Sequence, residues 1–264
     1  MTVRKVMESN PTAAVIIIGN EILSGRTNDQ NITYLAKRLT ELGIKLQQAI
    51  IIPDVTETII NTVRACQKNY TYVFTTGGIG PTHDDITADA IAKALRAPLT
   101  VHPEAKQILI NYYGKEHLNE SRLKMAFIPL GATLIANPVS AAPGFYLQNV
   151  YVMAGVPEIM RAMFDKIAAS LQPGATIFSE TVHSLLGESI LAKELGLIQA
   201  RYPEIDIGSY PYFKNRSFGL SLVLRGTDAA KIALALADVI ALVKEKGGNP
   251  ILENHQEMLG TNAG

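Results

Sequence analysis

The sequence of 264 residues contains no tryptophan and a single cysteine, Cys66. One cysteine excludes an internal disulfide bond and a cysteine-rich zinc site. The chain has no membrane-spanning run of about eighteen apolar residues, and its first residues lack the apolar core of a secretory signal. Its 24 basic and 24 acidic residues balance, which argues against a general nucleic-acid-binding surface. These absences favour a cytoplasmic protein that binds neither membranes nor nucleic acid.

Apolar strand patterns and amphipathic helix patterns alternate through the first part of the chain. This order is typical of a doubly wound, mostly parallel α/β sheet, which binds ligands at the carboxyl ends of its strands. Cys66 falls within a helical pattern and is expected to pack inward rather than to act as a nucleophile. Strands are predicted at 13–18, 44–52 and 71–76, and helices at 28–42, 56–68 and 87–95.

The pattern changes near residue 171. Before it, helices are predicted at 103–114, 121–127 and 158–170, with a hairpin formed by 145–147 and 150–153. After it, the order strand, helix, strand, strand, helix predicts a small α+β unit. We therefore expect domains at 12–170 and 171–250, with a loose tail at 251–264.

The most informative segment is the glycine-rich loop TTGGIGPTHDDIT at 75–87, between a predicted strand and a predicted helix. Glycines let the backbone approach a ligand closely, and the free N–H groups of a helix start attract phosphates. We expect Gly77, Gly78 and Gly80 to offer N–H groups to phosphate oxygens. The alternative is that Thr82, Asp84 or Asp85 merely caps the helix. The loop matches neither the P-loop nor the dinucleotide fingerprint.

Two adjacent aspartates, Asp84 and Asp85, are unusual in a phosphate-binding loop because they repel a bare phosphate. A divalent cation between the carboxylates and the phosphates would resolve this conflict. Both are therefore candidate catalytic residues and metal ligands. His83 lies between the loop's polar residues and is favoured as a solvated histidine over a catalytic one.

A second polar loop, GNEILSGRTNDQN at 19–31, follows the first predicted strand. In a parallel sheet it would lie beside the aspartate loop. Glu21 is the candidate second acid, either as a metal ligand or as a general base. Arg26 is a candidate phosphate ligand, and Ser24 and Thr27 are candidate hydrogen-bond donors. Alternatively, Thr27 or Asn28 is simply a helix N-cap.

These two loops, with NPVSAAPGF at 137–145 and GVPEIM at 155–160, occur in an order that resembles a known family. They are similar to the molybdopterin-binding (MoaB/Mog-like) domain of the competence/damage-inducible protein A (CinA) family. The resemblance implies a three-layer α/β/α domain, followed by a small KH-like subdomain that reaches nearly to residue 250. That subdomain has as many acidic as basic residues, so we expect a structural or oligomeric role rather than RNA binding.

The resemblance also implies chemistry. Family members are associated with metal-dependent hydrolysis of ADP-ribose to AMP and ribose 5-phosphate, with Mg²⁺ or Co²⁺ and also K⁺ as candidate cofactors. The related domain of FAD synthases hydrolyses FAD, and cofactor-biosynthesis relatives hold molybdopterin. The leading hypothesis is a nucleotide pyrophosphohydrolase. The alternatives are a molybdopterin- or nucleotide-binding protein without turnover and a structural adaptor. We expect a homo-oligomer, with a dimer favoured.

Some features depart from the family pattern. The C-terminal amidase domain of longer members is missing here, so its activity is not expected. Met153-Ala154-Gly155 replaces the usual Leu-Pro-Gly, and Ser140-Ala141 replaces Gly-Thr or Gly-Ser, both near the expected site and relevant to substrate choice. The candidate ligand-binding residues are Gly19, Ser24, Arg26, Asn28, Thr76, Gly77, Gly78, Gly80, Pro81, Thr82, Pro143, Gly144, Gly155, Pro157 and Glu158.

Overall fold

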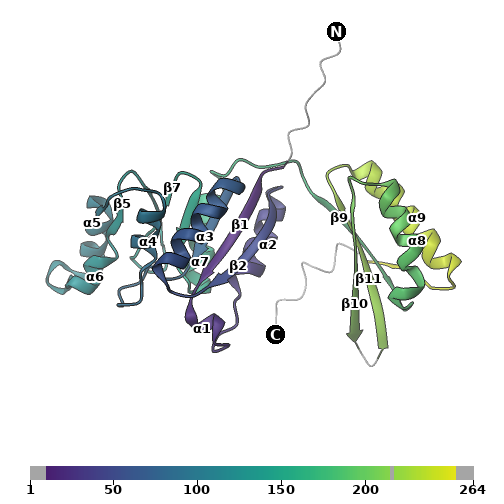
Figure 1. Ribbon diagram of the computed structural model, residues 1–264, viewed down its shortest axis with the longest axis horizontal. Coiled ribbons are helices and arrows are strands. Elements are labelled where there is room, and N and C mark those ends of the chain that lie inside the picture. The colour runs from purple at the N-terminus through teal and green to yellow at the C-terminus, as the bar shows by residue number, and fades with distance from the viewer. Residues whose placement is uncertain (1–9, 215–216, 254–264) are drawn as a thin grey trace, which may run out of the picture. The chain divides into compact units, whose positions relative to one another are not determined.

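The computed structural model describes residues 10–214 and 217–253, and the chain divides into two compact units between Gly174 and Ala175 (Figure 1). The sequence-based boundary between 170 and 171 lies a few residues earlier. Among the described residues, no helix has both the length and the apolar character needed to cross a membrane. Each unit has its own sheet and its own hydrophobic core.

The first unit is built on a mixed, mainly parallel sheet. Its strand order is β2-β1-β3-β8-β7-β6, in which neighbours from β2 to β8 are parallel and β7 is antiparallel to both β8 and β6. The strands are β1 (Thr12–Ile18), β2 (Lys45–Ile52), β3 (Tyr72–Thr76), β6 (Thr133–Ile135), β7 (Gly144–Leu147) and β8 (Val150–Met153).

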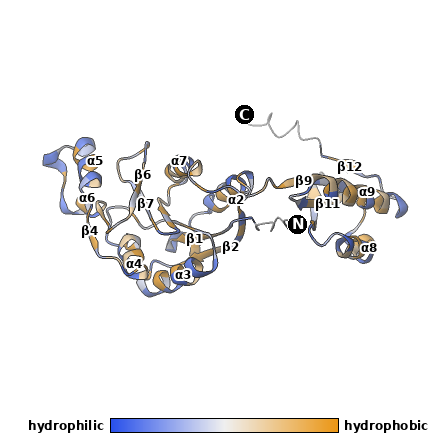
Figure 2. Cartoon of the chain, turned by 90° about the horizontal axis from the view of Figure 1, so that it is seen from above, coloured by the Kyte–Doolittle hydropathy of each residue, from blue (hydrophilic) through white to orange (hydrophobic). Residues whose placement is uncertain are grey.

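Helices cover both faces of this sheet, which confirms the three-layer α/β/α arrangement. Successive residues of β1 point to opposite faces: Val15 packs in the cluster with α2 and α7, and Ile16 packs in the cluster with α3 and α4. Hydrophobic and hydrophilic residues both occur along α3 and α4, as amphipathic packing requires (Figure 2). These helices are α2 (Asn31–Glu41), α3 (Thr56–Asn69), α4 (Thr87–Ala94) and α7 (Pro157–Ala168).

Cys66 lies on α3 with only 2% of its surface exposed. It packs in the core between α3 and the sheet, as the sequence predicted. Burial raises the pKa of its thiol, so the thiol stays protonated at neutral pH.

Several short elements were missed by the sequence analysis. Between α4 and β6 the chain forms a two-stranded antiparallel sheet of β4 and β5. The helices α5 and α6 lie between these two strands in the sequence. The segment 121–127, expected to be one helix, is instead divided between α6 and β5, and the first loop contains a one-turn helix, α1. The missed elements are α1 (Asn20–Leu23), β4 (Leu99–Val101) and β5 (Phe127–Pro129), with a 3₁₀ turn at Lys115–His117. Helix α5 (Pro103–Tyr113) confirms the helix predicted at 103–114, and α6 (Glu120–Lys124) covers part of the helix predicted at 121–127.

The second unit has the predicted order strand, helix, strand, strand, helix. Its antiparallel sheet has the order β10-β11-β9-β12, and α8 and α9 pack with it around a core that contains Val182 and Leu222. Residues Ile251–Leu252 form β12 rather than a loose tail, and residues 254–264 lie outside the described part. The elements are β9 (Phe178–Ser184), α8 (Glu188–Arg201), β10 (Asp206–Lys214), β11 (Ser217–Gly226) and α9 (Ala229–Glu245).

An aromatic cluster ties the central strands of the first unit to α7. Phe74 on β3 is fully buried, and its ring centroid lies 5.3 Å from that of Tyr151 on β8 and 5.6 Å from that of Phe164 on α7. Edge-to-face and tilted ring pairs of this kind add to the stabilisation from burial alone. Phe74 therefore fixes the strand whose end carries the glycine-rich loop.

We predict that Phe74→Ala lowers the free energy of unfolding of the first unit by about 3–5 kcal/mol, because it leaves a cavity at the centre of the sheet. Urea denaturation followed by circular dichroism measures the change. The matched control is Phe213→Ala, since Phe213 is 62% exposed on β10, and its effect should stay within about 0.5 kcal/mol. Equal destabilisation by both variants would contradict this account.

Candidate functional site

Three loops of the first unit meet at one edge of the sheet. In the parallel register Thr76 lies beside Ile17 of β1 and beside Met153 of β8, so the segments that follow these strands start at the same level. They enclose a cleft of about 560 Å³. The candidate residues that line it are Glu21, Thr27, Gly77, Gly78, Gly80, Pro81, Asp84, Asp85, Gly155 and Pro157.

The loops approach so closely at Gly77 that no side chain fits there. Gly77 has φ of 105°, and a Cβ atom on it would lie 2.1 Å from the carbonyl oxygen of Ile18. A Cβ atom on Gly155 would lie 3.2 Å from the Cα atom of Gly77. The amide of Gly77 donates to the carbonyl oxygen of Met153 at 3.1 Å, so the expectation that it binds phosphate is wrong. Gly78 and Gly80 stay candidates for that role.

A buried asparagine, which the sequence analysis missed, holds two of these loops together. Asn31 at the start of α2 donates from Nδ2 to the carbonyl oxygen of Gly155 at 2.9 Å and to the hydroxyl of Thr76 at 3.4 Å. Thr76 has no exposed surface, so it positions the site and does not line the cleft. Gly144 is also buried, and it is packed so closely that a Cβ atom on it would lie 2.5 Å from the carbonyl oxygen of Val152.

The two aspartates converge on one threonine. The hydroxyl oxygen of Thr82 lies 2.6 Å from Oδ1 of Asp84 and 2.5 Å from Oδ2 of Asp85, and the amide of Thr82 donates to Oδ2 of Asp85 at 2.8 Å. Helix α4 begins at Thr87 with Ile86 as N-cap and no capping side chain. The capping alternative for Thr82, Asp84 and Asp85 is therefore wrong.

Asp84 is held in its charged form. The hydrogen bond from Thr82 is the main reason that the pKa of this carboxyl is lowered, with a backbone hydrogen bond and the charges of His83 and Lys124 adding to the effect. Its side chain is 64% exposed, so the carboxylate also stays hydrated. Asp84 is thus ionised at neutral pH and below.

This pair suits a hard divalent cation. Mg²⁺ typically takes one or two carboxylates and fills its remaining positions with water and substrate phosphates. Within 10–214 and 217–253, no group of three or more His, Cys, Asp or Glu side chains is placed to hold a metal. Two converging carboxylates at an open cleft therefore fit a cation that is completed by water and a phosphate ligand.

Two further acidic residues line the cleft. Glu21 and Asp54 both line it, and Asp54 accepts a hydrogen bond from the amide of Asn20 at 2.9 Å. The sequence analysis missed Asp54. It follows β2, so the same rule of strand ends that selected Glu21 would have found it.

The other candidate residues lie outside the cleft lining. The hydroxyl of Ser24 donates to the carbonyl oxygen of Glu21, and Arg26 is exposed. The capping alternative for Thr27 and Asn28 is wrong, because α2 begins at Asn31 and its Ile32 amide donates to the carboxylate of Asp29. The candidates outside the lining are Gly19, Ser24, Arg26, Asn28, Thr76, Thr82, Pro143, Gly144 and Glu158.

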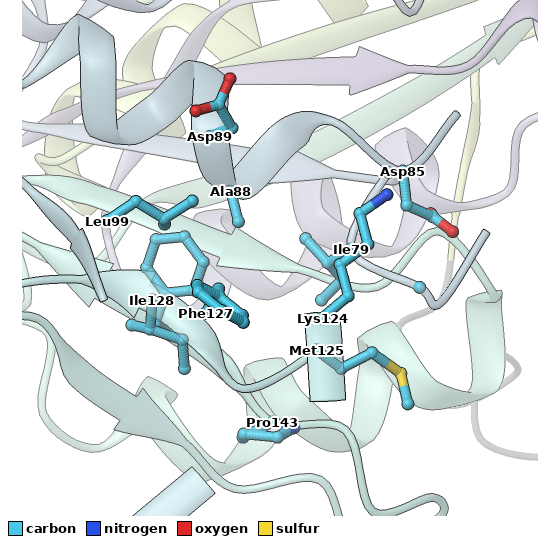
Figure 3. A pocket seen from close by; sticks show the side chains of 13 residues that line it. Ile79, Asp85, Ala88, Asp89, Leu99, Lys124, Met125, Phe127, Ile128 and Pro143 are labelled. Carbon is cyan, nitrogen blue, oxygen red and sulfur yellow. The ribbon is translucent and has the colours of Figure 1, made fainter. Parts of the chain in front are cut away.

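A smaller cavity of about 50 Å³ adjoins the cleft and shares Gly78, Gly80 and Asp85 with it. Pro143 lines this cavity, as does Lys124 from α6 (Figure 3). The ammonium group of Lys124 donates to the carbonyl oxygen of Thr82 and so ties α6 to the aspartate loop. No sequence signal marked Lys124, since only the tertiary fold brings α6 to this loop.

Comparison with known proteins identifies the family. A family described as a probable molybdopterin binding domain matches residues 14–173. The chain belongs to this family. A second description, FAD synthase middle domain, matches residues 176–249, so the second unit is similar to that domain. The resemblance of this part to a CinA subdomain stays a prediction.

Relatives and one solved structure agree with this assignment. A protein of Archaeoglobus fulgidus is 34% identical over 233 residues, which cover 88% of this chain and 98% of the relative. A probable FAD synthase of Caenorhabditis briggsae is 30% identical over 84% of this chain, but the chain spans only 49% of that protein. The crystal structure of CinA from Thermoplasma acidophilum is similar with a TM-score of 0.59 and 32% identity, over 61% of this chain and 98% of that one. These matches confirm a MoaB/Mog-like α/β fold.

We predict that Thr82→Val raises the pKa of Asp84 toward its ordinary value, because the variant removes the hydroxyl that stabilises the carboxylate. Titration of the side-chain carboxyl carbon by NMR measures the shift. Thr100→Val on β4 is the control, since Thr100 is exposed and lies outside the lining of the cleft. An unchanged titration of Asp84 in the Thr82 variant would show that the hydroxyl does not set its charge.

Proposed function

We propose that the cleft binds the diphosphate of a nucleotide-containing substrate, ADP-ribose or an FAD-like dinucleotide, and that the protein hydrolyses it to AMP and a phosphate ester. The observation that carries this proposal is the convergence of Asp84 and Asp85 on Thr82 beside Gly78 and Gly80. Carboxylates next to glycine amides suit a metal-bridged diphosphate better than a bare phosphate.

Each group has a role that its position allows. Asp84 and Asp85 would hold a divalent cation, which would supply neutralisation of phosphate charge and activation of water when bound. The amides of Gly78 and Gly80 donate to phosphate oxygens. Glu21, which also lines the cleft, accepts a proton from the attacking water. The water oxygen bonds to one phosphorus, the bond from that phosphorus to the bridging oxygen breaks, and the bridging oxygen leaves with the second phosphate.

Lys124 supports this reaction indirectly. Its bond to the carbonyl oxygen of Thr82 fixes the loop that carries both aspartates. Its positive charge also helps to keep Asp84 ionised. Lys124 therefore positions the proposed metal ligands without touching the reacting atoms.

The comparisons support a nucleotide substrate in general terms. One relative is named a probable FAD synthase, and the second unit matches the FAD synthase middle domain. A fold and a relative's name do not by themselves assign a reaction. The hydrolytic step rests on the aspartate pair, and the expected dimer and cytoplasmic location remain proposals as well.

A second candidate function is binding of molybdopterin or a nucleotide without turnover. The family description favours it. Both functions use the glycine loops in the same way. Metal dependence distinguishes them, because a chelator abolishes hydrolysis whereas simple binding has no general need of the cation.

We predict that Asp84→Asn and Asp85→Asn each lower the turnover of ADP-ribose or FAD by at least about tenfold with Mg²⁺ or Co²⁺ present, because each removes a charged metal ligand. Chromatography of released AMP measures the rate, with K⁺ and chelator as further conditions. Asp206→Asn, an exposed carboxylate on β10, is the control and should keep the wild-type rate. Wild-type turnover by both folded variants would remove the metal assignment.

No AMP from any substrate under any metal condition would favour the binding function. The same purified protein is then tested for pterin or nucleotide binding by thermal shift. A stabilising response to the ligand without turnover would establish the second candidate.

A further inference from the structure

A second, open cavity of about 330 Å³ lies next to the cleft and has no part in the chemistry proposed above. Tyr112 on α5 and Val139 in the loop before β7 are two of the residues that line it. They are 60% and 44% exposed, which is unusual for large apolar side chains that belong to the same cavity. We refer to this cavity, between α5 and residues 137–141, as the aromatic slot.

The aromatic slot adjoins the cleft through shared or touching residues. Ser140 lines both cavities. Tyr113 lines the cleft, and its ring packs edge-to-face against Tyr112 of the slot with a centroid distance of 4.9 Å. The cleft and the slot therefore meet at Ser140 and at the Tyr112–Tyr113 pair.

The loop that forms one wall of the slot is fixed in place. Asn137 donates from Nδ2 to the hydroxyl of Ser140 at 2.7 Å and to the carbonyl oxygen of Ala142 at 2.8 Å. Its Oδ1 accepts from the amides of Val139 and Ser140 at 3.1 and 2.9 Å. The side chain of Asn137 is thus used entirely to shape the loop, and the wall exists before any ligand binds.

Polar groups are available beside the apolar wall. The hydroxyl of Ser140 accepts from Asn137, which leaves its own proton free to donate. Asn111 also lines the slot; its Oδ1 accepts from Gln107 at 2.8 Å, and its amide nitrogen is a further hydrogen-bond donor. An aromatic face with donors at the rim suits a flat heteroaromatic ring that carries acceptor atoms.

We propose that the aromatic slot binds the heteroaromatic ring of the substrate, stacked on Tyr112 and covered by Val139, while its phosphates lie in the cleft. This inference rests on the proposed function for the phosphate position and adds the part that recognises the ring. The shared chemistry is a planar nitrogen heterocycle linked to a phosphate, and either adenine or the flavin ring provides it.

The test is equilibrium binding of three compounds in the presence of Mg²⁺, measured by calorimetry: AMP, FMN and ribose 5-phosphate. None of them contains a diphosphate, so binding is read without turnover. The variants are Tyr112→Ala and Tyr112→Phe, with Tyr210→Ala as a matched control, because Tyr210 is 49% exposed in the other unit. Circular dichroism verifies that each variant is folded.

The wild type should bind AMP or FMN at least about fivefold more tightly than ribose 5-phosphate, because stacking on an aromatic side chain adds this much. Tyr112→Ala should remove the preference and leave ribose 5-phosphate unchanged, and Tyr112→Phe and the control should retain it. Tighter binding of AMP would identify adenine as the ring, and tighter binding of FMN would identify flavin.

Equal affinity for ringed and ringless compounds overturns the proposal, and so does a Tyr112→Ala variant that keeps the preference. Lack of binding by both ring compounds overturns it as well. The outcome is separate from that of hydrolysis. A ring preference that depends on Tyr112, without any AMP release, supports the slot and overturns the proposed hydrolysis. AMP release without such a preference supports the hydrolysis and overturns the slot.

Discussion

The site depends on the contact between the backbones of three strand ends. Neighbouring parallel strands bring the carbonyl oxygen of Ile18, the Cα atom of Gly77 and the backbone of Gly155 together, and no atom beyond the backbone fits between Gly77 and Ile18. The amide of Gly77 donates to the carbonyl oxygen of Met153, and the side chain of Asn31 on α2 donates to the carbonyl oxygen of Gly155. These two bonds stabilise the contact. Gly77 and Gly155 both line the ligand cleft, so the sheet register that brings these strand ends together also sets part of its wall.

Charge is the second constraint. Glu21, Asp54, Asp84 and Asp85 line one cleft, and like charges gathered in one cleft oppose one another unless a cation or hydrogen-bond donors intervene. Thr82 supplies donors to two of them, and the amide of Asn20 supplies one to Asp54. The remaining negative charge favours a cation over a bare anion. Under the proposed function, a diphosphate would enter this cleft together with a divalent cation.

Much of this was accessible from the sequence, and the reasons for the rest are physical. The long apolar run of β1 and the amphipathic helices predicted the layers, because their periods extend over many residues. Strands as short as β4, with three residues, show no period, and the split of 121–127 depends on pairing with β4. The strand-end rule found Glu21 and the aspartates. It could not show that the Gly77 amide is already used or that Lys124 reaches Thr82, because both contacts exist only in the tertiary fold.

The comparisons and the cleft answer different questions. A match that covers 84% of this chain and 49% of a probable FAD synthase shows that the two proteins share similar units. It does not assign the activity of that whole protein to this chain. What a chain with these two units does must follow from side chains in its own cleft. Under the proposed function, Asp84 and Asp85 serve the diphosphate rather than the ring. The exposed Tyr112 beside that cleft indicates a ligand with both parts, and such a ligand explains why two unlike cavities share Ser140.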